Sequence, residues 1–456
     1  MKFPERGISR DQVVATMEKY RRTDGDAKNA RLFSLVYATP PEVTEVAKDA
    51  YTRFFSENAL NPMAFPSLRR FESEVLAMTS ALFHGDQNGT QAAGSMSSGG
   101  SESLLLAVKT ARDWARVNRP DVKEPEMLLP ITAHPALLKA AHMCTVKPVL
   151  VPMKSDFTAD VEAARRLFTA NTILVVGSAP QYPHGVVDPI EDLAALADSN
   201  GVLCHVDACI GGFMLPWVEK LGHAVPKWDF RVKGVTSISA DLHKYGYAAK
   251  GASTIMYRSS AIRRFQHFVH ADWPGGLFGS PSVLGTRPGG AIAAAWAVMN
   301  YLGEEGYLDL ARRAMSATKK LTSGINETPG LKVLGKPVMP AISFGANPDT
   351  SGGKELDLYV LSEKMQERGW RMDRQQNPTS LHLTISPGHD EVADTCIADL
   401  RECAKLVLDT NAQAEGAAAM YGMLGKLPDR GLVRETLLDF MDGLDTMADR
   451  AGEDAK

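Results

Sequence analysis

The spacing of hydrophobic and polar positions predicts the order of elements along the chain. The clearest helix is expected at 68–83, where Leu68, Phe71, Val75, Met78 and Leu82 recur at steps of three and four residues. This is the period of one helix face, so we expect the stripe to pack against a core. The preceding residues contain a weakly amphipathic segment at 10–20 and a helical pattern at 41–55. Residues 1–57 are therefore predicted to form a helical arm.

The middle of the chain alternates short apolar strands with helices. The expected strands are 127–131, 148–153, 172–177, 202–206, 235–239 and 253–257, and the expected helices are 104–117, 135–143, 159–170 and 190–199. Strands that are apolar throughout and separated by helices are typical of a parallel sheet covered on both faces. The pattern therefore predicts a doubly wound α/β core.

A second, smaller domain is expected after this core. A Gly/Pro-rich stretch at 274–290 precedes a helix of small residues at 291–301. Beyond about residue 310 the pattern becomes α+β, so we divide the chain into an arm at 1–57, a large domain at 58–309 and a small domain at 310–456. The small-domain strands are expected at 331–334, 341–344 and 380–385, with helices at 355–368 and 391–408 and a fraying end at 442–456.

Composition narrows the class of protein without indicating its chemistry. The 456 residues are 44% hydrophobic and 23% charged, and 50 basic against 54 acidic side chains give a net charge of -4. This balance argues against a general nucleic-acid binder. We see no secretory signal and no apolar run long enough to span a membrane. The five cysteines are an odd number without a C-x-x-C pair, which favours reduced thiols in a cytoplasmic protein and no metal site.

Four local features carry candidate chemistry. The small-residue run 94–103 leads directly into a helix, which suits a phosphate, although a flexible loop with a serine cap is the alternative. Asp207 follows a buried strand and either serves a cation or caps a helix. Lys244, preceded by His243, either forms a Schiff base or is a surface charge. His134 follows another strand and either stacks on a planar ligand or caps the next helix.

The order of these features on one sheet indicates pyridoxal 5'-phosphate. In that combination the lysine forms the imine, the aspartate keeps the pyridine nitrogen protonated, and the glycine run holds the phosphate. Walker A and G-x-G-x-x-G patterns are absent, so nucleoside triphosphates and dinucleotides lose support.

At these residues the sequence resembles the group II pyridoxal-phosphate decarboxylases, and within that group it is similar to the sphingosine-1-phosphate lyases. The resemblance runs from about Leu35 to near Met447. It is carried by seven stretches, at 58–72, 98–103, 177–185, 205–213, 237–251, 275–290 and 421–435. It implies a fold type I, aspartate-aminotransferase-like large domain with a mainly parallel sheet, plus a smaller α+β C-terminal domain.

The resemblance also implies roles for individual residues. Lys244 is the implied Schiff-base lysine, Asp207 the partner of the pyridinium, His134 the stacking ring, and Cys209 a neighbour of the opposite ring face. The phosphate-binding residues it implies are Gly100, Ser101, Ser239 and His243, together with Gly285 and Thr286 reaching the cofactor of a neighbouring subunit. A homodimer with two shared sites is therefore expected.

The residues expected to contact the substrate match the family pattern less completely than the residues expected to contact the cofactor. The implied positions are Tyr37, Asn58, Asn61, Tyr182 and Lys250, with the catalytic base near Tyr37, Tyr182 or Lys250. Where these lyases usually carry N-P-L-H-P, this chain carries Asn58-Ala59-Leu60-Asn61-Pro62. An amide at position 61 donates a hydrogen bond but lacks the charge of an imidazolium.

The resulting functional hypothesis is a carbon–carbon lyase. It would cleave sphingosine 1-phosphate or a related phosphorylated long-chain base at C2–C3 by retro-aldol chemistry, giving a long-chain aldehyde and phosphoethanolamine. An amino-acid decarboxylase on the same scaffold is the alternative, because the same cofactor residues serve both reactions. A third hypothesis, a homologue that binds cofactor or a partner without turnover, is disfavoured by intact Lys244, His134 and Asp207.

Overall fold

A seven-stranded sheet forms the centre of the molecule. The computed structural model describes residues 3–22, 24–26, 28–61, 63–87, 89–410, 414 and 416–450. The sheet order is β1-β7-β6-β5-β4-β2-β3. The strands are β1 Ala93–Ser97, β2 Glu126–Pro130, β3 Lys147–Val151, β4 Thr172–Ser178, β5 Leu203–Asp207, β6 Ser237–Ala240 and β7 Ser253–Tyr257. Strands β3, β2, β4, β5 and β6 pair in parallel, whereas β7 is antiparallel to both β6 and β1. The predicted mainly parallel α/β sheet is confirmed.

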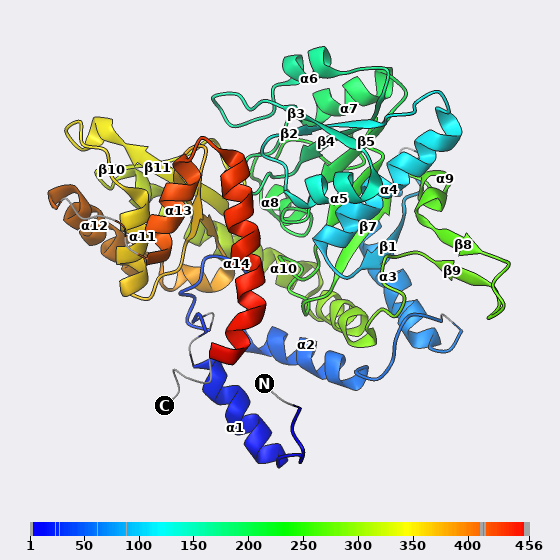
Figure 1. The fold of residues 1–456 in the computed structure, drawn as a ribbon, viewed down its shortest axis with the longest axis horizontal. Helices are drawn as coiled ribbons and strands as arrows, with labels where there is room; N and C mark the ends of the chain where they lie inside the picture. The colour runs from blue at the N-terminus through cyan, green and yellow to red at the C-terminus, as the bar shows by residue number, and fades with distance from the viewer. Residues whose placement is uncertain are drawn as a thin grey trace.

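Helices cover both faces of this sheet (Figure 1). They are α3 Pro66–Leu82, α4 Gly100–Asn118, α5 Ala136–Cys144, α6 Val161–Leu167, α7 Ile190–Ser199, α8 Leu215–Lys220 and α9 Ser260–Arg263. Because side chains alternate along a strand, β2 contributes to two cores. Met127 and Leu129 pack with α4 and α5, and Leu128 packs with α7 on the other face.

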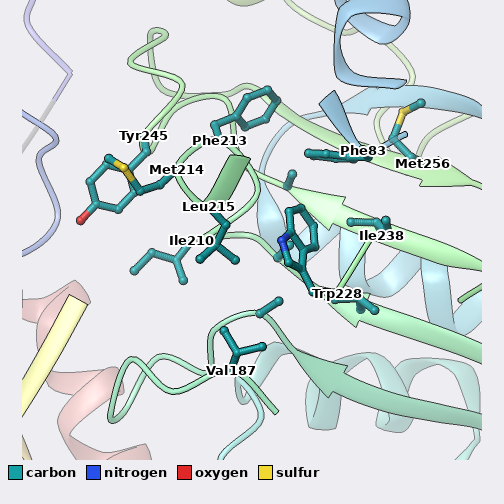
Figure 2. Close-up of a cluster of buried hydrophobic side chains, with 14 of the residues drawn as sticks. Phe83, Val187, Ile210, Phe213, Met214, Leu215, Trp228, Ile238, Tyr245 and Met256 are labelled. Carbon is teal, nitrogen blue, oxygen red and sulfur yellow. The ribbon is translucent and has the colours of Figure 1, made fainter. Parts of the chain in front are cut away.

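The larger core is built around aromatic side chains. Trp228 and Phe83 are fully buried with their ring centroids 5.3 Å apart, and Figure 2 shows them beside Ile238 of β6. Figure 2 also shows Ile210, Phe213 and other side chains of the segment after β5 in the same cluster. The cluster therefore anchors the chain on the carboxyl side of Asp207.

The C-terminal part of the chain, called the small domain below, has its own antiparallel sheet and apolar core. Its sheet order is β10-β11-β13-β12, and its buried apolar cluster includes Leu321, Phe344 and Trp370. The strands are β10 Gly330–Val333, β11 Ala341–Asn347, β12 Asp373–Gln375 and β13 Ser380–Thr384, and the helices are α11 Leu358–Glu367, α12 Ala393–Asp409, α13 Gly416–Lys426 and α14 Arg430–Arg450. Short 3₁₀ turns occupy Arg264–Gln266, Pro348–Thr350 and Pro387–Asp390.

One long helix joins the two parts. Helix α10, Gly289–Asn326, is broken at Gly303, where φ is 53° and ψ is -170°. The expected boundary at 309/310 falls inside this helix, and the division into domains stays a prediction. Helix α10 packs against α2, Pro41–Arg53, which with α1, Arg10–Arg21, makes up the helical part of the N-terminal arm (Figure 1).

The arm is not helical throughout. Between its helices, Phe33 joins the small-domain core, its backbone N–H donates to Arg371, and its carbonyl accepts from Thr384. This segment therefore adds an extended piece beside the small-domain sheet.

Several predicted elements need correction. The first half of the small-residue run is the edge strand β1, α4 begins at Gly100 instead of residue 104, and the helix expected at 291–301 is the longer α10. A short hairpin of β8, Phe268–His270, and β9, Phe278–Ser280, was not predicted. The end expected to fray from residue 442 is helical to Arg450, and residues 451–456 lie outside the described part.

All five cysteines are buried thiols. In the described part of the chain, every helix is either too short or too polar to cross a membrane.

Candidate active site

The carboxyl ends of the strands meet at one edge of the central sheet. Strand β1 runs in the same direction as the parallel strands because it is antiparallel to β7, which is itself antiparallel to β6. A cavity of about 580 Å³ lies at this edge, where open α/β sheets bind ligands. It is lined by Leu35, Tyr37, Ser98, Gly99, Gly100, Ser101, Glu102, Leu104, His134, Ser178, Pro180, Tyr182, Asp207, Cys209, Ile210, Asp241, His243, Lys244, Lys250 and Thr384.

The N-terminus of α4 forms one wall of the cavity. The helix begins at Gly100 after Gly99, with no side-chain cap, so the alternative of a serine-capped flexible loop is wrong. A Cβ atom at Gly100 would come within 2.7 Å of Asp241 Oδ2 and 3.0 Å of Cys209 Sγ. Glycine therefore lets the positive end of a 19-residue helix approach the cavity closely, which favours an anion there.

Lys244 projects into the same cavity and pairs with a buried carboxylate. Its Nζ lies 2.8 Å from Asp241 Oδ2, and Asp241 Oδ1 has no hydrogen-bond partner among the described residues. Burial alone would lower the pKa of Lys244, but Asp241 reverses this and the net shift is upward. Burial likewise opposes ionisation of Asp241, yet Lys244 and His243 hold the pKa of that carboxyl below its usual value. The alternative of a solvated surface lysine is wrong.

Asp207 ends strand β5 at the floor of the cavity. Its Oδ1 accepts a hydrogen bond from the backbone N–H of Cys209 at 3.0 Å, and the next helix begins only at Leu215, so Asp207 is not a helix cap. Ser239 lies behind it, 3.5 Å from the same oxygen, and accepts from Cys209 Sγ at 3.3 Å. The carboxylate is thereby fixed with room to meet a cationic nitrogen of a ligand.

Two histidines at the cavity are oriented by the backbone. His134 Nδ1 accepts from the N–H of Ala136 at 3.1 Å, so this residue caps the start of α5 while it lines the cavity. His243 Nδ1 accepts from the N–H of Ala252 at 3.2 Å, and burial lowers the pKa of His243. Both sequence alternatives for His134, a ring at a ligand and a helix cap, are compatible with this geometry.

Tyr37, Tyr182 and Lys250 also line the cavity. Lys250 Nζ donates to the carbonyls of Leu35 at 2.9 Å and His243 at 3.1 Å, and lies 5.3 Å from the Tyr37 ring centroid. Burial raises the pKa of Tyr37 to about 12 and lowers that of Lys250. Tyr37 is therefore a neutral donor at physiological pH.

The remaining sequence-predicted residues do not line this cavity. Ser239 lies beneath it, whereas Asn58, Asn61, Gly285 and Thr286 belong to two neighbouring surface segments. A β-bridge joins Asn58 to Pro288, and the side chain of Asn61 is exposed, its Oδ1 accepting from the N–H of Met63.

Sequence reasoning missed two aspartates and a glutamate at the site. Asp241 lies only three residues before Lys244, and this short spacing could have indicated their ion pair. Asp373 contacts Tyr182 from the small domain, and Glu102 accepts from Ser98 and from Val283. The contacts of Asp373 with Tyr182 and of Glu102 with Val283 span 191 and 181 residues, which is too far for sequence spacing to reveal them.

Comparison with known proteins assigns this arrangement to a family. Residues 28–347 match the pyridoxal-dependent decarboxylase conserved domain. A sphingosine-1-phosphate lyase of Arabidopsis thaliana is 42% identical, over 96% of this chain and 80% of the relative. The solved sphingosine-1-phosphate lyase of Burkholderia pseudomallei has a TM-score of 0.84 at 37% identity, covering 90% of this chain and 94% of that one.

The chain belongs to the sphingosine-1-phosphate lyases of the pyridoxal-dependent decarboxylase family. A probable L-aspartate decarboxylase of Pyrococcus furiosus is also 33% identical, over 86% of this chain and all of the relative. Family membership confirms the predicted fold class, the cofactor and the assignment as a pyridoxal-phosphate-dependent lyase.

The residues of the cavity fit that cofactor. The close approach of Gly100 leaves the α4 N-terminus open to a phosphate, and the Asp207 carboxylate at the end of β5 has the charge that a protonated ring nitrogen would need. Asp241 and Lys244 both line the cavity, with Asp241 Oδ2 paired to the amine and Asp241 Oδ1 unpartnered, so this amine is the group that would bind the cofactor covalently.

Proposed function

We propose that this protein cleaves sphingosine 1-phosphate, or a related phosphorylated long-chain base, at C2–C3 to a long-chain aldehyde and phosphoethanolamine. The observation that carries the proposal is 42% identity over nearly the whole chain to a sphingosine-1-phosphate lyase, with Lys244, Asp207 and the α4 N-terminus at one cavity. Bound pyridoxal phosphate supplies an electron sink for the broken carbon–carbon bond.

The chain's own residues would act around that group. Lys244 would hold the cofactor, Asp207 would stabilise positive charge on its ring, and Gly100 would leave the helix N-terminus open to its phosphate. Tyr37 lies where it would donate a hydrogen bond to the substrate hydroxyl, and Tyr182 lies where it would accept the proton of that hydroxyl. Lys250 lies beside Tyr37, where it would pair with the substrate phosphate.

The test compares two substrate classes on the cofactor-loaded protein. We expect aldehyde and phosphoethanolamine in equal amounts from sphingosine 1-phosphate, and no carbon dioxide from a panel of amino acids. Lys244→Ala should lose both the visible imine absorbance and turnover, which links the products to this site. Carbon dioxide from an amino acid without aldehyde from the lipid would instead establish a decarboxylase, the alternative favoured by the similarity to the Pyrococcus protein.

A substitution at Asn61 provides a second test in the same assay. Because an amide carries no charge, Asn61→His should lower the KM for sphingosine 1-phosphate if this position meets the substrate phosphate. Met63→Ala, at an exposed neighbouring side chain, is the matched control. An unchanged KM in the histidine variant would remove position 61 from the substrate site.

A homodimer with shared sites is part of the proposal. It is supported by the exposed Gly285 and Thr286, which lie away from their own chain's cavity, and by exposed apolar side chains on the adjoining segment. These include Phe268, Val269, Trp273, Leu277 and Val283, each more than half exposed. Such a patch is typical of a surface that binds another protein. The proposed location is the cytoplasm, which suits five buried reduced thiols.

Sharing is tested by mixing two inactive variants. Lys244→Ala removes the amine, and Thr286→Asp places a negative charge where we expect the partner's cofactor phosphate. Random hybrids would contain one site free of both changes, so activity should recover to about a quarter of wild type after co-refolding. A sedimentation mass equal to one 49.4 kDa chain, or no recovery in verified hybrids, would contradict shared sites.

A further inference from the structure

Tyr182 is the one cavity tyrosine whose hydroxyl donates to a carboxylate among the described residues. Its Oη donates a hydrogen bond to Asp373 Oδ2, and Ser34 Oγ donates to the other oxygen, Oδ1, at 2.9 Å. Tyr182 follows β4, Asp373 begins β12 of the small domain, and Ser34 belongs to the N-terminal segment. Three distant parts of the chain therefore fix one phenol at the cavity.

The surroundings hold the Tyr182 ring as well as its hydroxyl. The His382 ring lies 4.2 Å from it, centroid to centroid, at an interplanar angle of 31°. His382 is directly opposite Asp373 in the β12–β13 pair. Gln375, two residues beyond Asp373, donates to the carbonyl of Pro183 at 2.8 Å. The small-domain sheet thus contacts both the side chain of Tyr182 and the backbone of the next residue, Pro183.

The direction of this hydrogen bond determines what Tyr182 offers a substrate. Burial and the neighbouring carboxylate raise the pKa of Tyr182 far above its usual value, so the phenol keeps its proton and donates it to Asp373. The lone pairs of its oxygen are then left for a second partner in the cavity. A substrate hydroxyl is a suitable donor to them.

We propose that Asp373 is a positioning residue that makes Tyr182 the proton relay of the carbon–carbon cleavage. This inference rests on the proposed function. The hydroxyl proton at C3 passes to Tyr182 Oη while the phenolic proton passes to Asp373 Oδ2. The C2–C3 bond breaks as the C3–O bond becomes the aldehyde carbonyl, and the electron pair of the broken bond goes to the cofactor ring.

Protons and electrons balance over the full reaction. The proton held by Asp373 returns through Tyr182 to the carbon that lost the bond, which is the proton that phosphoethanolamine needs there. No oxidant or reductant is required. Tyr182 is the catalytic residue of this pair, because it alone reaches the cavity, and Asp373 acts through it.

Asp373→Asn tests the relay with little change in shape. The amide oxygen still accepts a hydrogen bond but cannot take up a proton. We expect kcat for sphingosine 1-phosphate to fall about 100-fold, the usual scale for a lost acid–base group, with KM changed less than threefold. Tyr182→Phe should fall similarly, and the double variant no further, because the two residues act as a unit.

Two controls separate a relay from a structural tie. Ser34→Ala removes the other hydrogen bond of the same carboxylate, and Asp399→Asn removes a small-domain carboxylate that accepts from Trp370 and Arg368 away from the cavity. Asp399→Asn should keep kcat within threefold of wild type, and Ser34→Ala should lose much less kcat than Asp373→Asn because the carboxylate remains. The imine absorbance and thermal midpoint of Asp373→Asn should match wild type.

The outcomes are distinct. A fully active Asp373→Asn, multiplicative losses in the double variant, or an equal loss in Ser34→Ala would overturn the relay and leave the proposed function intact. Absence of aldehyde from the wild-type holoenzyme would refute the proposed substrate and the relay for it.

Discussion

Glu102 shows how one buried side chain organises two segments of the site. Its Oε2 accepts from the N–H and hydroxyl of Ser98 at 2.7 and 2.6 Å, and its Oε1 accepts from the N–H groups of Val283 and Leu284 at 2.7 and 3.3 Å. Ser98 precedes the α4 N-terminus, and Leu284 precedes Gly285. One carboxylate therefore connects the proposed phosphate cradle to the loop proposed to reach the partner.

Glu102→Gln should weaken cofactor binding. An amide supplies only one acceptor oxygen, so its NH₂ would face donors that are already committed, at a cost of about 1–3 kcal/mol. We expect the cofactor dissociation constant, from titration of the imine absorbance, to rise about tenfold. Glu126→Gln is the matched control, because Glu126 is equally buried but accepts from Lys147 and Thr169 away from the cavity. Equal cofactor affinity in the two variants would contradict this role.

Individual residues also show how much of the candidate site could be predicted from the sequence. Lys244, Asp207 and His134 were predicted because each follows an apolar strand, and the ends of parallel strands converge. Asp373 follows no such rule. It begins a three-residue strand in another domain, and its contact with Tyr182 spans 191 residues, so only the folded chain reveals it.

At the scale of elements, apolar periodicity predicted the strands that are buried on both faces. Strand β1 was missed because its residues are small and polar, which resembles a loop, although all but its first residue are buried. Its pairing with β7 comes from tertiary context rather than from propensity. The result is that the glycine run is a strand and a helix start joined directly, and this fixes the position of Gly100.

The length of helix α10 was underestimated because a local signal was again overridden by tertiary packing. The prediction stopped at residue 301, near the helix breaker Gly303, whose φ of 53° is accessible to glycine at little cost. Helical structure nevertheless continues, because Leu310 and Leu321 on the second half pack into the two separate cores. Packing on both sides of the break outweighed the local signal.

The whole molecule should lose stability on mild acidification. Burial lowers the pKa values of His184, His205, His382 and His389 to about 4, against an ordinary value near 6.5. Between these values the unfolded chain binds more protons than the native one, so the free energy of unfolding falls as pH falls. Asp188 acts oppositely, because burial raises its pKa to about 7. The four histidines outweigh it, for a net loss of about 3–5 kcal/mol between pH 7 and 5.

Calorimetry of the cofactor-saturated protein at pH 7 and pH 5 measures this loss. We expect a thermal midpoint several degrees lower at pH 5. Asp188→Asn should steepen the decline, since it removes the opposing carboxyl. A midpoint that is unchanged or higher at pH 5 would show that these histidines are not neutral in the native protein.

The hydrogen bond between Ser34 and Asp373 has a consequence for the order of biosynthesis. The two residues are 339 positions apart, so at about 5–20 residues per second the ribosome adds Asp373 roughly 20–70 s after Ser34. Throughout that interval the extended segment around Phe33 has no sheet to join. The nascent chain therefore carries an unpaired extended segment around Phe33 until Arg371 and Thr384, its backbone partners, have been added.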